Sequence, residues 1–80
     1  MKVKVLYFSS LKEKIGKPFE EIDIEESSLE DLKRKITQLH PEISDYLNKI
    51  MFAVNEEYVS TDIVLKDGDT VALIPPVSGG

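Results

Sequence analysis

Segment 27–41 constrains the fold more than any other part of the chain. Glu30 follows Ser27 by three residues, which is the spacing of a helix capping box, and acidic residues here suit the positive end of a helix. His40 and Pro41 end this predicted helix. A helix with one apolar stripe must bury it against another layer of secondary structure. Apolar residues at helical spacing predict that stripe, formed by Leu29, Leu32, Ile36 and Leu39.

The segments on either side of this helix are predicted to form the second layer. Gly16 closes a short helical turn at 9–15, and Pro41 opens a second short helix that extends over 41–50. The other segments either alternate between apolar and polar residues or are short apolar runs bounded by turn residues, as strands are. Five strands are predicted in this way, at 2–8, 19–24, 51–54, 58–59 and 71–74.

The order of these elements predicts an α+β fold of the ubiquitin-like β-grasp type, with a mixed sheet and one main helix packed across it. In that fold the first and last strands are central parallel neighbours. Side-chain alternation then places several apolar residues on the sheet face away from the helix, where they would form a docking surface. The residues of this predicted docking surface are Leu6, Phe8, Ala72 and Ile74, with Tyr58 extending it. The alternative interpretation is that they are scattered apolar residues of an ordinary protein surface.

Composition limits the classes of partner and location. The 80 residues carry a net charge of −5, and nucleic-acid binding needs a basic face, so we expect no nucleic-acid partner. No segment approaches the length of a membrane span, so we expect no membrane association. The absence of cysteine excludes disulfides and thiolate sites and fits a cytoplasmic protein.

The last ten residues combine a strand, two prolines and a thin tail. Pro75 and Pro76 lack the N–H that a central strand needs, so the ladder should end there. Residues 1–76 are therefore predicted as the domain and residues 77–80 as a flexible tail, which would reach about 13–14 Å when extended. The terminal carboxylate of Gly80 is the predicted functional group. The alternative is a frayed end without chemistry.

The sequence ends in Pro75-Pro76-Val77-Ser78-Gly79-Gly80. This ending and two other parts of the sequence resemble the MoaD family, the small sulfur-carrying subunits of molybdopterin synthase. The resemblance covers the full length, and its most specific part is the ending Pro75-Pro76-Val77-Ser78-Gly79-Gly80. Thiamine-pathway carriers of the ThiS type share the fold and the Gly-Gly but usually lack the Pro-Pro-Val lead-in. The other two parts are Val5-Leu6-Tyr7-Phe8 and Ala53-Val54-Asn55, and the ending is preceded by Leu65-x-Asp67-Gly68-Asp69-x-Val71.

The resemblance implies a cycle of covalent chemistry on Gly80. An E1-like adenylating enzyme (MoeB-like) would join Gly80 to AMP, and a sulfur donor would replace AMP to leave a thiocarboxylate. The large subunit of molybdopterin synthase (MoaE-like) would then take up the tail, and sulfur would pass to a pterin precursor to form the dithiolene of molybdopterin. The chain would be a non-catalytic, sulfur-donating subunit, with no metal and no bound cofactor.

The resemblance and the physics of the tail together assign roles to the remaining site residues. Gly79 keeps the tail thin, and Ser78 and Val77 thread into the partner's pocket. Pro75 and Pro76 stiffen the exit from the domain, which lowers the entropy lost on insertion. The partner interface would comprise the apolar residues of the docking surface, with Phe8, Tyr58 and Ile74 as its anchors.

Three other functions remain open from the sequence. The chain could carry sulfur into another pathway, such as thiamine synthesis or tRNA thiolation. It could be a ubiquitin-like modifier that forms isopeptide bonds through Gly80. It could also be an interaction module with an inert tail. The sequence does not distinguish molybdenum from tungsten as the metal of the finished cofactor.

Overall fold

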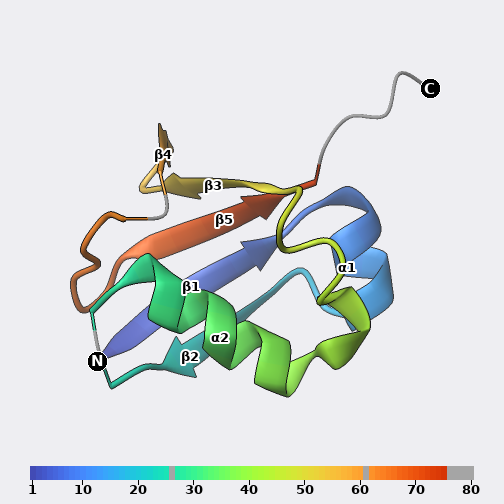
Figure 1. Ribbon diagram of the computed structural model, residues 1–80, viewed down its shortest axis with the longest axis horizontal. Coiled ribbons are helices and arrows are strands. Elements are labelled where there is room, and N and C mark those ends of the chain that lie inside the picture. Colours follow the sequence, from blue (N-terminus) through green and yellow to red (C-terminus); the bar gives the residue numbers. More distant parts are fainter. Residues whose placement is uncertain (26, 61, 76–80) are drawn as a thin grey trace.

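The computed structural model describes residues 1–25, 27–60 and 62–75, and within them it contains one five-stranded sheet. The strands lie in the order β2-β1-β5-β3-β4 (Figure 1). β1 and β5 are central and parallel, and the other neighbouring pairs are antiparallel. This topology confirms the predicted α+β fold and the β-grasp arrangement. The strands are β1 (Lys2–Tyr7), β2 (Phe19–Asp23), β3 (Met51–Val54), β4 (Glu57–Val59) and β5 (Thr70–Ile74).

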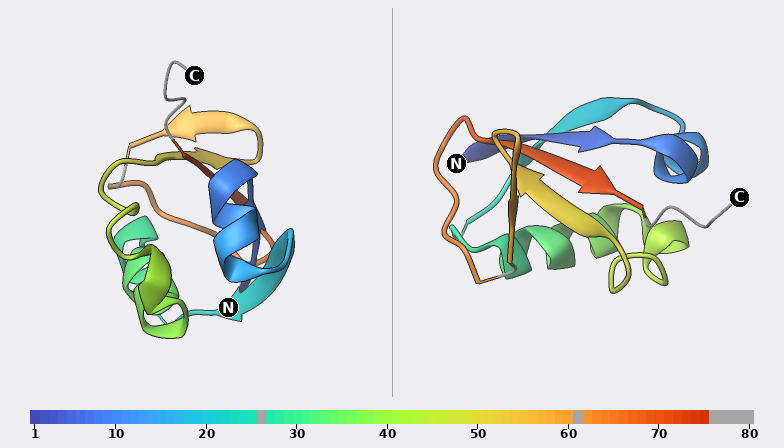
Figure 2. Two further views of the ribbon diagram at one scale, coloured as in Figure 1. Left: turned by 90° about the vertical axis from the view of Figure 1, so that its right-hand side faces the viewer. Right: turned by 90° about the horizontal axis from the view of Figure 1, so that it is seen from above.

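The helices are α1 (Ser9–Ile15), α2 (Leu29–Leu39) and a 3₁₀ turn, η1 (Pro41–Ile43). α2 lies across one face of the sheet, with its long axis crossing the strands (Figures 1 and 2). α1 ends at Gly16, whose φ of 88° is the left-handed conformation expected at that position. The prediction of a continuous helix over 41–50 is wrong. Hydrogen bonds of the i to i+3 type, such as Tyr46 to Ile43 and Lys49 to Tyr46, make successive tight turns there instead.

The N-terminus of α2 differs from the predicted capping box by one residue. Ser28 is the cap, and its Oγ accepts a hydrogen bond of 3.0 Å from the N–H of Asp31. Ser27 instead uses its backbone carbonyl, which accepts from the N–H of Leu65. Two adjacent serines precede the helix, and the pairing of Ser27 with the returning chain decides which one is left to cap it.

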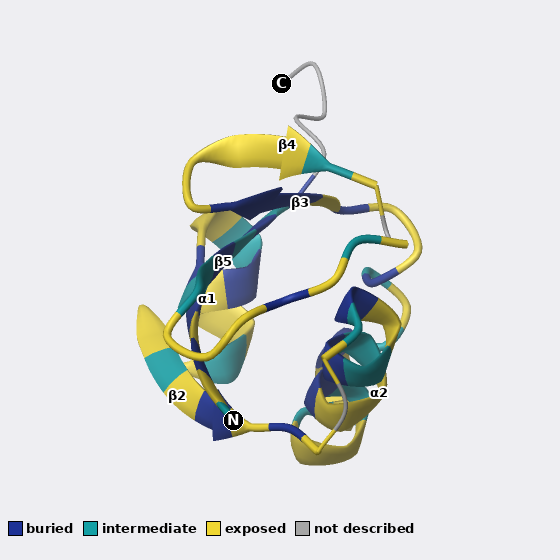
Figure 3. Cartoon of the chain, turned by 90° about the vertical axis from the view of Figure 1, so that its left-hand side faces the viewer, coloured by how far each residue is buried: buried dark blue, intermediate teal, exposed yellow. Residues whose placement is uncertain are grey.

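The core lies between the sheet and α2, and the buried side of α2 faces the strands (Figure 3). Three of the four residues in the predicted stripe are completely buried, whereas Leu39 is 48% exposed. Leu39 lies at the margin of the stripe and is the last residue of the helix, so the prediction of its burial is wrong. The buried residues of the sheet and of α2 include Val3, Val5, Tyr7, Ile22, Phe52, Val54, Val71 and Leu73, with Leu29, Leu32 and Ile36.

The last residue of the chain that is described is Pro75, directly after β5. The predicted tail, and with it Pro76, Val77, Ser78, Gly79 and Gly80, lies outside the described residues. The boundary between domain and tail therefore stays a prediction.

Candidate functional site

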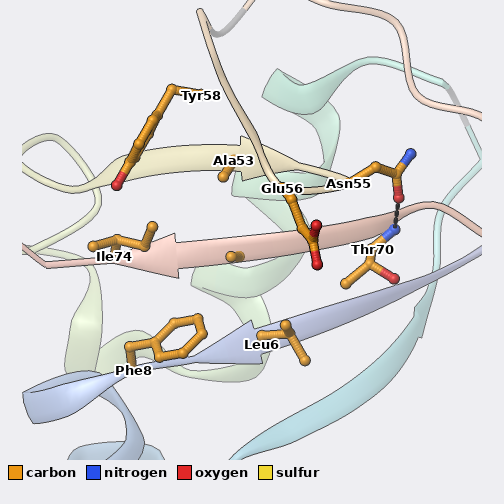
Figure 4. Close-up of a pocket in the computed structure, with 9 residues that line it drawn as sticks. Leu6, Phe8, Ala53, Asn55, Glu56, Tyr58, Thr70 and Ile74 are labelled. Carbon is orange, nitrogen blue, oxygen red and sulfur yellow. Dashed lines mark hydrogen bonds between the residues drawn. The ribbon is translucent and has the colours of Figure 1, made fainter.

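A hollow of about 530 Å³ lies on the sheet face away from α2 (Figure 4). Its lining is mostly apolar, and it includes every residue that the sequence placed in the predicted docking surface. Those residues come from β1, β4 and β5 and from the position after β1. They are Leu6, Phe8, Tyr58, Ala72 and Ile74.

Strand register explains why these side chains meet. Leu6 pairs with Ala72 across the parallel β1–β5 ladder, and Ala72 pairs with Ala53 across the antiparallel β5–β3 ladder. Ala53 in turn pairs with Tyr58 on β4, and paired residues point to the same face of a sheet. Phe8 keeps an extended backbone after the end of β1, with φ −116° and ψ 154°, so its side chain continues the alternation.

The large side chains of this face are left open to solvent. Phe8 is 44% exposed and Tyr58 is 64% exposed. Burial of their aromatic rings in an interface would be favourable, because aromatic side chains bury a large apolar area. Residues of β1 with the opposite parity, Val5 and Tyr7, are completely or nearly completely buried. An exposed aromatic cluster around a hollow, opposite a well-packed core, is typical of a protein-binding surface.

Sequence reasoning missed four residues that also line the hollow: Ala53, Asn55, Glu56 and Thr70. Ala53 belongs to an apolar run that the sequence indicated as wholly buried, and it is 6% exposed at the floor of the hollow. Thr70 precedes Ala72 by two residues, so strand parity could have identified it. Asn55 and Glu56 form the turn between β3 and β4, and their contribution depends on how that turn folds over the sheet.

The turn between β3 and β4 is tied to the start of β5 by three hydrogen bonds. Asn55 Oδ1 accepts from the N–H of Thr70 at 3.0 Å, and the N–H of Asn55 donates to the Thr70 carbonyl at 2.8 Å. Asn55 Nδ2 also donates to Asp69 Oδ1 at 3.0 Å. Hydrogen bonds from Asn55 and from the N–H of Lys66 hold the pKa of Asp69 below its ordinary value. The turn residues therefore have a defined position beside the hollow.

A separate cluster of polar side chains joins β1, β2 and the end of α2. Tyr7 donates its hydroxyl proton to Glu20 Oε2, and His40 Nε2 lies 2.5 Å from the same oxygen. Burial raises the pKa of Tyr7 far above its ordinary value, and the hydrogen bond to Glu20 adds to this effect. Partial burial also acts to raise the pKa of Glu20, but the hydrogen bonds from Tyr7 and His40 outweigh it and lower that pKa. His40 is the C-cap of α2, as its position before Pro41 indicated.

Within the described residues, no three His, Asp or Glu side chains are grouped so that they could hold a metal ion. In that same part of the chain, no helix has both the length and the apolar character that crossing a membrane requires.

The hollow and the last described residues of the chain are adjacent. Ile74, the last residue of β5, lines the hollow, and Pro75 follows it as a buried residue. The roles predicted for Gly80, Gly79, Ser78, Val77, Pro76 and Pro75 are not tested by the described residues and stay predictions.

Comparison with known proteins gives the family of the chain. The family model described as "ThiS family" matches residues 5–80. The molybdopterin synthase sulfur carrier subunit of Dictyostelium discoideum is 43% identical, over 96% of this chain and 94% of that protein.

Two solved structures agree with this assignment. One is a complex of subunits 1 and 2 of the molybdopterin-converting factor from Helicobacter pylori, which contains a chain that is 31% identical. That chain superposes with a TM-score of 0.74 over the whole of both chains. The other is small archaeal modifier protein 1 from Haloferax volcanii, which is 25% identical with a TM-score of 0.88, again over both whole chains. The ubiquitin-like β-grasp topology, the apolar face beside the end of β5 and the match through residue 80 thus lead to one conclusion: this chain belongs to the ThiS family and is a relative of the molybdopterin synthase sulfur carrier subunits, the MoaD family.

Proposed function

We propose that this chain is the sulfur-carrying small subunit of a molybdopterin synthase and that Gly80 carries the sulfur. The observation that carries the proposal is the 43% identity to a sulfur carrier subunit over nearly the full length of both proteins. The family match also extends to residue 80, so it includes the Gly79-Gly80 ending.

The proposed chemistry takes place on the carboxylate of Gly80. An E1-like, MoeB-like enzyme uses ATP to form an acyl-adenylate at Gly80 and releases pyrophosphate. A sulfur donor then attacks the acyl carbon and displaces AMP, which leaves a thiocarboxylate. The sulfur next passes to a pterin precursor in the large subunit. We place this cycle in the cytoplasm.

The proposed main partner is a MoaE-like large subunit, which docks on the hollow. The Helicobacter pylori complex of subunits 1 and 2 supports a partner of this kind, because one of its chains aligns with the whole of this chain. Phe8, Tyr58 and Ile74 would bury their exposed apolar surface against it, and each fully buried side chain of this size contributes about 1.5–3 kcal/mol. Val77 and Ser78 then thread the tail into the partner's active site, while Pro75 and Pro76 restrict its direction.

A second candidate function is protein modification through Gly80. The similarity to small archaeal modifier protein 1 favours this candidate, because that structure superposes over the whole chain. Sulfur carriage into thiamine synthesis or tRNA thiolation is a further alternative. The ThiS family match supports it as well as it supports sulfur carriage into molybdopterin synthesis.

The proposal is tested by removing Gly80 from the full chain. Wild type and the variant without Gly80 are incubated with the adenylating enzyme of the same organism, ATP and a sulfide source, and thiocarboxylate is measured by intact mass. We expect the modified species in wild type only, with identical circular-dichroism melting curves for both proteins. Equal sulfur acceptance by the truncated chain contradicts the role of Gly80. Thiocarboxylate formation followed by transfer to another pathway's acceptor, with none to the pterin precursor, favours the alternative pathways.

A further inference from the structure

Among the described residues that line the hollow, Glu56 is the one acidic residue. Its side chain extends from the β3–β4 turn over β5, and its carboxylate lies above the sheet between the turn and Thr70 (Figure 4). The other residues that line the hollow are predominantly apolar. A partner docked there would therefore enclose the Glu56 carboxylate in surroundings of low polarity.

The position of Glu56 is held by the backbone. Its φ is 74° and that of Asn55 is 50°, so both residues of the turn are left-handed. This conformation suits a two-residue hairpin loop, where asparagine is common at such positions and glycine is preferred at the second. A glutamate at the second position is strained, and such strain persists where the surrounding structure supports it. Here the three hydrogen bonds that Asn55 makes with Thr70 and Asp69 supply that support.

The carboxylate of Glu56 has no ion-pair partner among the described residues, whose side-chain ion pairs involve other acids. Covering an ionised carboxylate without a counter-charge costs free energy that apolar contacts would have to offset. A partner that presents a cation at this point avoids that cost. It also benefits from the strengthening of charge–charge attraction in a medium of low polarity.

We propose that Glu56 determines partner specificity by pairing with a basic side chain that the large subunit presents to the hollow, next to its apolar contacts with Phe8, Tyr58 and Ile74. This inference rests on the proposed function. The net charge of −5 on the chain acts in the same direction, because it attracts a partner with a basic face before contact is made. Glu56 thus supplies a charged, oriented contact in an interface that is otherwise mostly apolar.

The neighbouring residue provides a matched control. Glu57 is also an exposed glutamate, but it is the first residue of β4 and pairs with Val54, whose side chain belongs to the core side of the sheet. Glu57 therefore points to the opposite face and lines a different depression, with Val54 and Val59. Replacing either glutamate by glutamine removes one negative charge at nearly the same place in the sequence.

The experiment measures the dissociation constant for the purified large subunit of the same organism, at low and at high salt, by isothermal titration calorimetry. We expect Glu56→Gln to weaken binding by about tenfold at low salt and to reduce its salt dependence, whereas Glu57→Gln stays near wild type. Glu56→Arg should weaken binding further. Thermal melting of each variant checks folding, and no change is expected because no hydrogen bond of the Glu56 side chain contributes to the described fold.

The outcomes separate this inference from the proposed function. If wild type binds and Glu56→Gln binds equally well, or if both glutamine variants weaken binding to the same degree, the inference is overturned while the proposed function stands. If wild type does not bind the large subunit at all, the proposed function fails, and the inference fails with it.

Discussion

At the scale of single residues, Glu20 has the most unusual surroundings in the described fold. Its side chain is 16% exposed, and its Oε2 accepts from Tyr7 and lies against His40 Nε2. Lys17 also lies near, with its Nζ 3.4 Å from Glu20 Oε1, and His40 Nδ1 is 3.6 Å from Glu42. This one carboxylate therefore connects β1, β2 and the C-terminus of α2.

We expect the free energy of unfolding to depend on pH through Glu20. Folding lowers the pKa of Glu20 below its ordinary 4.5, so its contribution is complete above that value and is lost as pH falls through the folded pKa. Glu20→Gln should cost about 1.5–3 kcal/mol at neutral pH, which is the range for hydrogen bonds to a charged group. Urea unfolding between about pH 5 and about pH 3 should show the difference between wild type and variant shrinking.

Tyr7 should make the free energy of unfolding depend on pH on the alkaline side. Folding raises its pKa, so its contribution is present below the ordinary value of 10.0 and is lost as pH rises above it. Tyr7→Phe should therefore flatten the loss of stability at high pH. It should also weaken the acid dependence that Glu20 causes, because it removes one of the hydrogen bonds that lower the pKa of Glu20. A difference between wild type and Glu20→Gln that stays constant across the acid range would contradict this role of the cluster.

Ser28 and Glu56 show which residue-level features the sequence does not determine. Ser27 and Ser28 both suit a helix cap, and the choice depends on the backbone bond from Leu65 to Ser27, a contact across many residues of chain. Glu56 reaches the hollow only because the turn that contains it is bonded to β5. Local patterns predict which residues can cap or turn, and long-range contacts decide which of them do.

At the scale of elements, the buried face of α2 is the part of the helix that stabilises the fold. Leu32 is completely buried against the sheet, whereas Leu39 at the end of the same helix is 48% exposed. Leu32→Ala should lower the free energy of unfolding by about 2–5 kcal/mol, because it removes buried contacts and leaves a cavity. Chemical denaturation measures this change.

Leu39→Ala is the matched comparison on the same helix. It exchanges the same residue types at a largely exposed position, so it should cost less than about 1 kcal/mol. Equal costs for the two variants would show that Leu39 is packed in solution, as its helical spacing indicates.

Strands are easier to predict from this sequence than the helical segments, for a physical reason. Side chains alternate strictly along a strand, so parity alone places Leu6 and Ala72 on the face away from α2. Segment 41–50 has apolar residues at positions that suit a helix, yet the chain makes successive tight turns while still burying Ile43 and Leu47. The spacing of apolar residues predicts which side chains are buried. It does not distinguish a continuous helix from successive tight turns that bury the same side chains.

At the scale of the whole molecule, the β-grasp brings the hollow and the exit of the chain together. The parallel pairing of β1 with β5 places Phe8 and Ile74 beside the hollow, and Pro75 follows directly. A partner docked on the hollow would thus be next to Pro75, the last described residue before the predicted tail. The fold and the family could both be predicted from the sequence, because the resemblance to the MoaD family extends over the whole chain and is most specific at its ending.

The central claim is that Gly80 carries sulfur, and intact mass spectrometry of the chain purified from its native cell tests it most directly. We predict a species heavier by the replacement of one oxygen with sulfur. Fragmentation should place the change on Gly80, and alkylation of the same atom should separate it from oxidation of Met1 or Met51. A chain that carries only the unmodified carboxylate, together with conjugates joined to other proteins through Gly80, would contradict the claim and establish the modifier function instead.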